Sequence, residues 1–194
     1  MVRISLAQCA RKVIGIDVDK EAMDYMGRTY KRENLEFYQT DTIEWLSEAR
    51  SYDLIVMFEV IEHVLEQDRL PQAVRRALKD VGVLLLSTPN RHYTPFHRRN
   101  PYHVHEFLPD EILSLVEKHF TLKRFFGQVP GKLALLPLPW FLLTRIIQVL
   151  PSASGITTFN AKPDTSGTIV IVAQTNNHSV TTFSDADSLS QYSV

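Results

Sequence analysis

Short apolar runs alternate with amphipathic stretches along most of the chain. The runs have the length of buried strands and cover residues 13–17, 35–38, 53–58, 83–87, 122–126 and 168–173. The stretches between them carry apolar residues three and four positions apart, which is typical of helices, and cover residues 5–12, 20–31, 42–49, 70–78 and 109–119. This alternation predicts an α/β fold in which a mainly parallel sheet carries helices on both faces.

Two of the apolar runs end abruptly in polar side chains. One run closes on Asp17, and the run 53–58 is followed by Glu59, Glu62 and His63. In open α/β sheets, ligands bind beyond the carboxyl ends of the parallel strands. We therefore expect these groups at the mouth of a binding site for a nucleotide-like cofactor with a ribose.

Composition narrows the class of protein. The chain has 194 residues, of which 44% are hydrophobic, so we expect a single domain with an ordinary core. A net charge of −1 gives no electrostatic footprint of the kind that duplex nucleic acid requires. The single cysteine, Cys9, cannot pair within the chain, and the N-terminal residues lack a signal-peptide core, which together favour the cytoplasm.

The last third of the chain departs from the regular pattern. The apolar stretch 133–144 contains two prolines and is too short to span a bilayer. A substrate cap, core packing and peripheral membrane contact through 129–151 remain as alternatives. We predict one domain over 1–176, with an insert or substrate cap at 129–165. Residues 177–194 have too few apolar side chains to pack, and we expect a disordered tail there.

Four motifs occur in order along the chain: VIGIDVD at 13–19, NLEFYQTD at 34–41, YDLIVMFEVIEHV at 52–64 and LKDVGVLLLSTPN at 78–90. In this order and at these intervals they resemble the class I S-adenosylmethionine-dependent methyltransferases. The resemblance covers residues 5–126 and 165–174. It implies a Rossmann-like sheet with an antiparallel last strand, and S-adenosylmethionine as the cofactor.

The resemblance also assigns cofactor contacts to residues at the strand ends. The carboxylate of Asp17 would accept hydrogen bonds from the ribose hydroxyls, and Asp41 would accept from the adenine amino group. The complete set of implied contacts is Asp17, Val18, Asp41, Thr42, Phe58, Glu59 and Val60. A helix-capping role is the competing interpretation for both aspartates.

One expected feature of the resemblance does not occur in this sequence. The first strand of such methyltransferases and its glycine-rich turn should precede residues 5–12, and that strand belongs between the strands at 13–17 and 53–58. The chain contains no Gly-x-Gly segment that could replace the turn. We therefore expect a domain that is incomplete at its N-terminus, with the first strand missing and two strands lacking a neighbour. Binding of S-adenosylmethionine with ordinary affinity would contradict this expectation.

Histidines and carboxylates near the second half of the sheet supply candidate chemistry. An oxygen acceptor benefits from a general base, for which His63 is the candidate, or from a metal ion. Together with His103, the spacing of Glu59, Glu62 and His63 resembles the metal site of the 2′-O-methyltransferases of small RNAs. Two carboxylates and two imidazoles would favour Mn²⁺, Fe²⁺, Co²⁺ or Zn²⁺ over Mg²⁺. The competing interpretation is a set of ordinary polar residues at a helix start and in a loop.

The acceptor molecule is suggested by a short segment of the polar loop at 88–108. Residues 100–107, Asn-Pro-Tyr-His-Val-His-Glu-Phe, are similar to segments of methyltransferases in glycan, quinone and small-metabolite pathways. We therefore expect O-methylation of a glycan or small metabolite. The alternative from another class is a catalytically inactive, methyltransferase-like fragment that serves as an interaction module. A NAD-dependent dehydrogenase is a distant third, because the EVIEHV block has no counterpart in the dinucleotide fingerprint.

Overall fold

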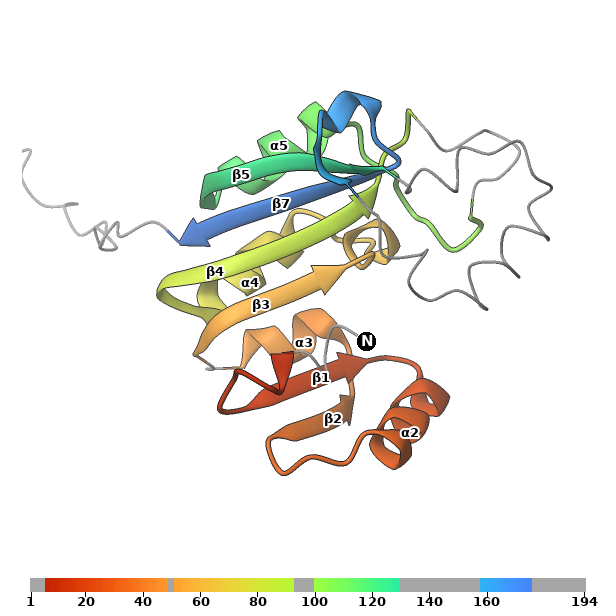
Figure 1. The fold of residues 1–194 in the computed structure, drawn as a ribbon, viewed down its shortest axis with the longest axis vertical. Coiled ribbons are helices and arrows are strands. Elements are labelled where there is room, and N and C mark those ends of the chain that lie inside the picture. Colours follow the sequence, from red (N-terminus) through yellow and green to blue (C-terminus); the bar gives the residue numbers. More distant parts are fainter. Residues whose placement is uncertain (1–5, 49–50, 93–99, 130–157, 176–194) are drawn as a thin grey trace, which may run out of the picture.

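The computed structural model describes residues 6–48, 51–92, 100–129 and 158–175 (Figure 1). Its elements in chain order are β1 (Val13–Asp17), α2 (Lys20–Thr29), β2 (Leu35–Gln39), α3 (Thr42–Ser47), β3 (Tyr52–Phe58), the 3₁₀ turn η1 (Ile61–His63), α4 (Arg69–Ala77), β4 (Leu78–Pro89), α5 (Pro109–Glu117), β5 (Phe120–Val129), β6 (Thr158–Ala161), the 3₁₀ turn η4 (Pro163–Thr165) and β7 (Thr168–Thr175). From β1 onward, the alternation of strands and helices predicted from the hydrophobic pattern is confirmed. The helix predicted at 5–12 is not, because residues 7–12 form turns and a bend.

The strands β1 and β2 form a parallel two-stranded sheet, against which α2 packs. The two strands pair along their full lengths, 13–17 with 35–39. The helix begins after Asp19, whose carboxylate accepts hydrogen bonds from the amides of Glu21 and Ala22 at 2.8 and 3.2 Å. The turn that follows β1 is therefore fixed by a helix cap.

The other strands form a five-stranded sheet with the order β3-β4-β7-β5-β6. The strands β3 and β4 are parallel, whereas β7 lies between β4 and β5 and is antiparallel to both. It follows that β3, β4 and β5 run in one direction and β7 in the other. The prediction of an antiparallel last strand is confirmed.

The core lies between the five-stranded sheet and the helices α4 and α5, which Figure 1 shows behind the sheet. The positions of α4 spaced three and four apart face inward, and none of them is more than 4% exposed. The most deeply buried side chains of this core include Leu70, Val74, Leu84, Leu86, Ile112, Val116, Ile169 and Ile171. Burying a Leu or Ile side chain contributes about 1.5–3 kcal/mol, so these rows hold the helices on the sheet.

The two sheets are not joined by strand pairing within the described residues. There, β1 pairs only with β2, and β3 pairs only with β4. Side chains make the link instead: the rings of Tyr38 and Trp45 lie 4.8 Å apart, and the Trp45 Nε1 donates to the Tyr52 hydroxyl at 2.8 Å. The interruption between β1 and β3 is the place from which the sequence predicted a strand to be missing (Figure 1).

Some boundaries differ from the prediction. The strand expected at 83–87 begins directly after α4, and its register with β3 shifts between Tyr52 and Leu54. Val81 in this irregular part has φ of 59°, a left-handed conformation that a β-branched residue rarely adopts. The strand β6 was not predicted. Residues 130–157 of the predicted insert or cap and the tail predicted at 177–194 lie outside the described residues.

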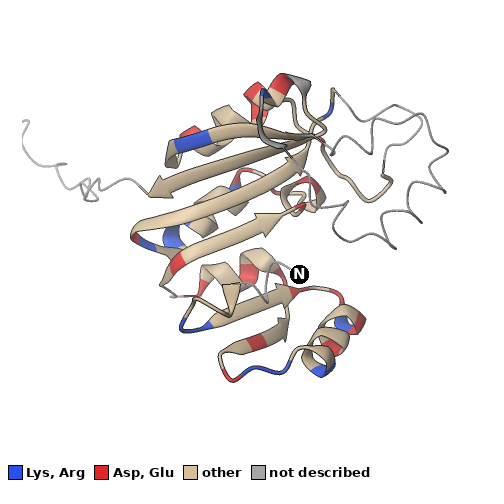
Figure 2. Cartoon of the chain, viewed as in Figure 1, with Lys and Arg blue, Asp and Glu red and all other residues tan. Residues whose placement is uncertain are grey.

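Charge is spread over the elements rather than segregated. Figure 2 shows basic and acidic residues interspersed along α2, in keeping with the net charge of −1. Within the described ranges, no helix combines the length and the apolar character that crossing a membrane would demand.

Candidate functional site

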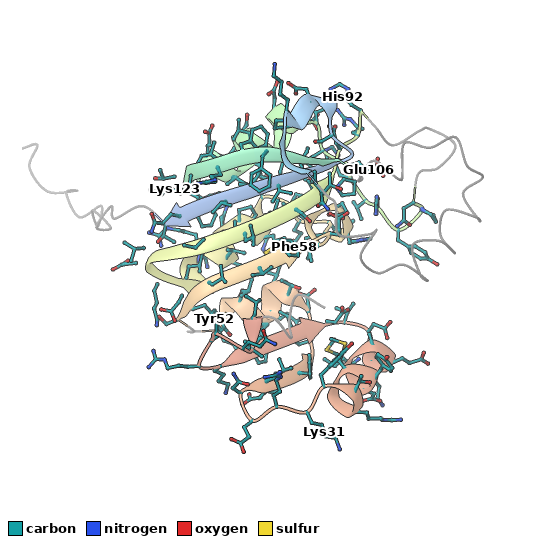
Figure 3. All side chains as sticks on the ribbon, in the orientation of Figure 1. Lys31, Tyr52, Phe58, His92, Glu106 and Lys123 are labelled. Carbon is teal, nitrogen blue, oxygen red and sulfur yellow. The ribbon has the colours of Figure 1, made fainter. Side chains whose placement is uncertain are left out.

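The carboxyl ends of β1 and β3 lie at the same edge of the fold, because both strands point in the same direction (Figure 1). Asp17 is the last residue of β1 and Phe58 the last residue of β3. Figure 3 shows Phe58 on β3 and Glu106 beyond it, on the side toward which β3 points. The strand-end residues predicted from the sequence are therefore brought to one edge, where ligands of open α/β sheets bind.

Asp17 is half-buried, and its carboxylate is held by the local turn. One carboxylate oxygen, Oδ1, accepts a hydrogen bond from the amide of Asp19 at 3.1 Å. The backbone carbonyl of Asp17 accepts from the amide of Thr40 at 3.0 Å, which ties the end of β1 to the end of β2. The neighbouring Val18 is 63% exposed. Asp17 thus has a fixed orientation and, among the described contacts, a second oxygen left for a ligand.

Asp41 is the N-cap of α3. Its Oδ1 accepts hydrogen bonds from the amides of Ile43 and Glu44 at 2.8 and 3.1 Å. The capping interpretation is therefore correct for this residue. Contact with adenine through the other oxygen stays a prediction, as does the role of Thr42, the first residue of α3.

Glu59 directly follows β3 in a left-handed conformation with φ of 55°. Such a conformation is uncommon for residues other than glycine and persists where surrounding contacts fix it. Two hydrogen bonds to Ser87 on β4 do so: the Glu59 amide donates to the Ser87 carbonyl at 3.1 Å, and the Ser87 hydroxyl donates to the Glu59 Oε1 at 2.8 Å. β3 therefore ends in a sharp turn, with Phe58 36% exposed beside it and Val60 packed against the core.

Glu62 in η1 is fully buried. Its Oε2 accepts from the Thr88 hydroxyl at 3.1 Å, whereas its Oε1 has no hydrogen-bond partner. Its backbone carbonyl accepts from the amides of Val104 and His105 at 2.8 and 3.2 Å, which fixes that segment against η1. Burial raises the pKa of the Glu62 carboxyl, and the charge of Glu59 acts in the same direction.

The imidazoles of His63 and His103 pack edge to face, with ring centroids 4.8 Å apart. The Nδ1 of His63 lies 3.0 Å from the Tyr102 carbonyl oxygen, and the Nδ1 of His103 lies 2.8 Å from the Glu106 Oε1. A carbonyl and an ionised carboxylate only accept hydrogen bonds, so Nδ1 is the protonated nitrogen of both rings. In the neutral rings, the lone pair is therefore on Nε2.

Three of the four predicted metal ligands lie together. One ligand atom each from Glu62, His63 and His103 lies within 4.8 Å of the other two. The fourth, Glu59, is not part of this group, and its Oε1 accepts a hydrogen bond from the Ser87 hydroxyl. Glu106 was not predicted, although its spacing of three residues from His103 is a usable signal.

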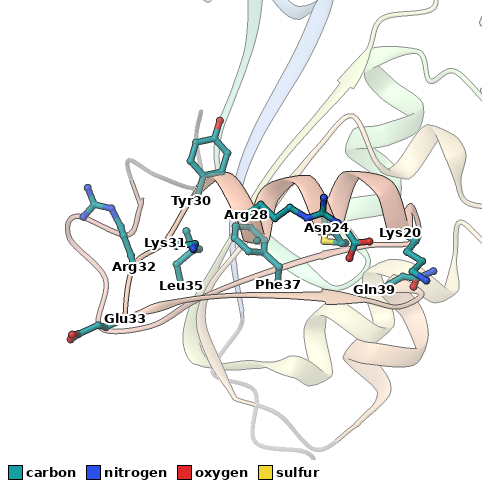
Figure 4. Close-up of a pocket in the computed structure, with 12 residues that line it drawn as sticks. Lys20, Asp24, Arg28, Tyr30, Lys31, Arg32, Glu33, Leu35, Phe37 and Gln39 are labelled. Carbon is teal, nitrogen blue, oxygen red and sulfur yellow. The ribbon is translucent and has the colours of Figure 1, made fainter.

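A separate groove of about 880 Å³ lies between α2 and β2 (Figure 4). Its lining includes Lys20, Asp24 and Arg28 of α2 and Phe37 of β2. None of the residues predicted to contact a cofactor or metal lines this groove. The groove is therefore distinct from the edge that carries Asp17 and Glu59.

The sequence matches known proteins over its first two thirds. Residues 2–126 match the family described as "Methyltransferase domain". A probable S-adenosylmethionine-dependent methyltransferase of Mycobacterium tuberculosis is 36% identical over 117 residues, which are 57% of this chain and 41% of that protein. A ubiquinone biosynthesis O-methyltransferase of Bartonella tribocorum is 31% identical over 88 residues, 44% of this chain and 36% of that protein. The chain spans about two fifths of the length of the curated relatives that it matches.

Solved structures share the fold. The N-methyltransferase NodS of Bradyrhizobium japonicum, in complex with S-adenosyl-L-homocysteine, has a TM-score of 0.59 at 16% identity and covers 88% of this chain and 70% of its own. A putative S-adenosylmethionine-dependent methyltransferase of Listeria monocytogenes has a TM-score of 0.62 at 15% identity, with 90% and 84% covered. At such identities the similarity concerns the Rossmann-like fold alone.

Proposed function

Because the chain belongs to the methyltransferase-domain family, we propose that it transfers a methyl group from S-adenosylmethionine to a hydroxyl oxygen of a glycan or small metabolite. The observation that carries the proposal is that Asp17, at the end of β1, and Phe58 and Glu59, at the end of β3, lie at the same edge of the fold. Oxygen as the acceptor atom is supported by the O-methyltransferases among the relatives.

In this proposal the ribose of the cofactor is bound by Asp17. A carboxylate can accept one charge-assisted hydrogen bond from each hydroxyl of a diol, and the Asp19 amide already orients it. Asp41 and Thr42 at the start of α3 are assigned to the adenine, and Phe58, Glu59 and Val60 to the methionine part. The exposed ring of Phe58 offers an apolar surface beside this part of the cofactor.

The reaction is an in-line displacement at the methyl carbon. The acceptor oxygen forms a bond to this carbon while the carbon–sulfur bond breaks, and S-adenosylhomocysteine leaves with the electron pair. The hydroxyl proton must leave as well, either to a base such as the Nε2 of His63 or, if a bound cation were to lower the hydroxyl pKa, to water. The residues of the edge contribute by holding the two reactants in line.

Calorimetric titration with S-adenosylmethionine tests the proposal. We expect saturable one-to-one binding by the chain, with an affinity below the ordinary range because the sequence contains no Gly-x-Gly turn. The substitution Asp17→Asn keeps an acceptor for the Asp19 amide but removes the charge, so we expect affinity to fall about tenfold or more, since hydrogen bonds to charged groups contribute about 1.5–3 kcal/mol. The matched control Asp24→Asn changes an exposed aspartate of α2 and should bind like the unsubstituted chain.

The interruption between the two sheets favours a second candidate, an inactive methyltransferase-like fragment that serves as an interaction module. A strand edge without a ladder partner is a template for pairing with another chain. This candidate predicts no saturable binding of S-adenosylmethionine and no effect of Asp17→Asn. The same titration therefore separates the two functions.

A further inference from the structure

We propose that Glu62, His63 and His103 bind one divalent transition-metal ion. Their ligand atoms lie within 4.8 Å of one another. An ion with ligand distances of about 2.0–2.2 Å holds tetrahedral ligands about 3.4 Å apart, so the three side chains need to close by little more than 1 Å. Metal binding itself does not depend on the proposed function.

The two imidazoles are already oriented as metal ligands. In each ring the Nδ1 donates to a fixed acceptor, the Tyr102 carbonyl for His63 and the Glu106 carboxylate for His103. Metal-binding histidines commonly donate their second ring N–H to a carboxylate or a backbone carbonyl in this way, because it fixes the tautomer and the ring orientation. Glu106 is itself almost fully buried, so its carboxylate is held behind the imidazole rather than in solvent.

The carboxylate of Glu62 provides an independent indication. It is fully buried, and its Oε1 has no hydrogen-bond partner while Oε2 accepts from Thr88. A buried polar atom without a partner is destabilising, and more so when it is charged. A cation between this oxygen and the two imidazoles would offset that cost.

The chemistry of the three ligands selects the metal. Imidazole nitrogens suit Zn²⁺, Co²⁺, Fe²⁺ and Mn²⁺ better than Mg²⁺ or Ca²⁺, which prefer all-oxygen sites. Three protein ligands leave at least one coordination position open, as in catalytic rather than structural sites. Binding of an acceptor hydroxyl at this open position rests on the proposed function. In that case His63 holds the ion and does not accept the hydroxyl proton.

Cobalt titration of the chelator-treated full chain, followed by its visible absorption, tests the site without any cofactor present. We expect one ion per chain, displacement by Zn²⁺ and no displacement by an excess of Mg²⁺. The substitutions His63→Gln and His103→Gln should each weaken binding about a hundredfold or more, and Glu106→Gln about 10–100-fold, the range known for partners that orient a ligand. His105→Gln is the matched control from the same segment and should bind like the unsubstituted chain.

Absence of stoichiometric cobalt binding would overturn the proposed site. Unchanged cobalt affinity in both histidine variants would do so as well, and so would an equally large loss of cobalt affinity in the His105 control. His63 is exposed, so His63→Gln keeps the test valid if substitution of the less exposed His103 disturbs folding, which thermal unfolding would reveal. Failure here would leave the proposed function standing, because S-adenosylmethionine binding is measured separately.

Discussion

Asp41 caps α3 and is proposed to bind the adenine, and a pair of substitutions can separate these two roles. Its carboxylate caps α3 through the amides of Ile43 and Glu44, and the same group is assigned to the adenine. Serine is also a good N-cap, so Asp41→Ser should leave the free energy of unfolding nearly unchanged, whereas Asp41→Ala should lower it by about 1 kcal/mol. Both variants lack the carboxylate and should bind S-adenosylmethionine more weakly.

Denaturant unfolding and calorimetric titration of the two Asp41 variants check this separation. Equal cofactor affinity in Asp41→Ser and the unsubstituted chain would reduce Asp41 to a helix cap. A loss of affinity confined to Asp41→Ala would show that α3, rather than the carboxylate, is what the cofactor requires.

Residues that end strands could be located from the sequence, whereas the residues that distant segments bring next to them could not. Asp17 and Glu59 follow apolar runs directly, and the burial of such runs fixes where they end. The role of Glu106 depends on the Tyr102–Glu106 segment lying against η1, which is set by backbone hydrogen bonds to the Glu62 carbonyl. Backbone contacts between distant segments leave no side-chain pattern, so the sequence could not show that Glu62, His63 and His103 lie together without Glu59.

At the scale of elements, strands buried on a regular sheet were predicted more accurately than irregular ones. The strand β1 has the predicted bounds, because its apolar run is uninterrupted. The strand β4 begins at Leu78 rather than at the predicted residue 83, because residues 79–82 form an irregularity within the strand. The turn η1 contains Glu62 and His63 but begins after Glu59, which therefore lies outside it.

The link between α3 and β3 can be measured as a coupling energy. The Trp45 Nε1 donates to the Tyr52 hydroxyl, and Trp45 also packs against Tyr38 of β2. We expect Trp45→Phe and Tyr52→Phe to be non-additive by about 1 kcal/mol in a double-mutant cycle, the typical contribution of one hydrogen bond. Trp45→Phe with the exposed Tyr25→Phe should be additive within about 0.3–0.5 kcal/mol. Additivity of the first pair would mean that this bond does not hold the two sheets together.

At the scale of the whole molecule, the two sheets predict an uneven pattern of amide exchange. The strand β7 has neighbours on both sides, whereas within the described residues β3 pairs only with β4. Amides of β7 should exchange slowly throughout, and those of β3 should alternate between slow and fast, because successive amides of a strand point to opposite edges. Hydrogen exchange followed by NMR measures both strands at once. Uniformly slow exchange along β3 would mean that its second edge is covered.

The most direct test of where the cofactor binds is a crystal structure of the chain with S-adenosylhomocysteine. We expect the ribose hydroxyls to lie within hydrogen-bond distance, about 2.5–3.0 Å, of the Asp17 carboxylate, with the sulfur beside Phe58 and Glu59. Density for the ligand elsewhere, such as in the groove between α2 and β2, with Asp17 free of contact, would contradict it.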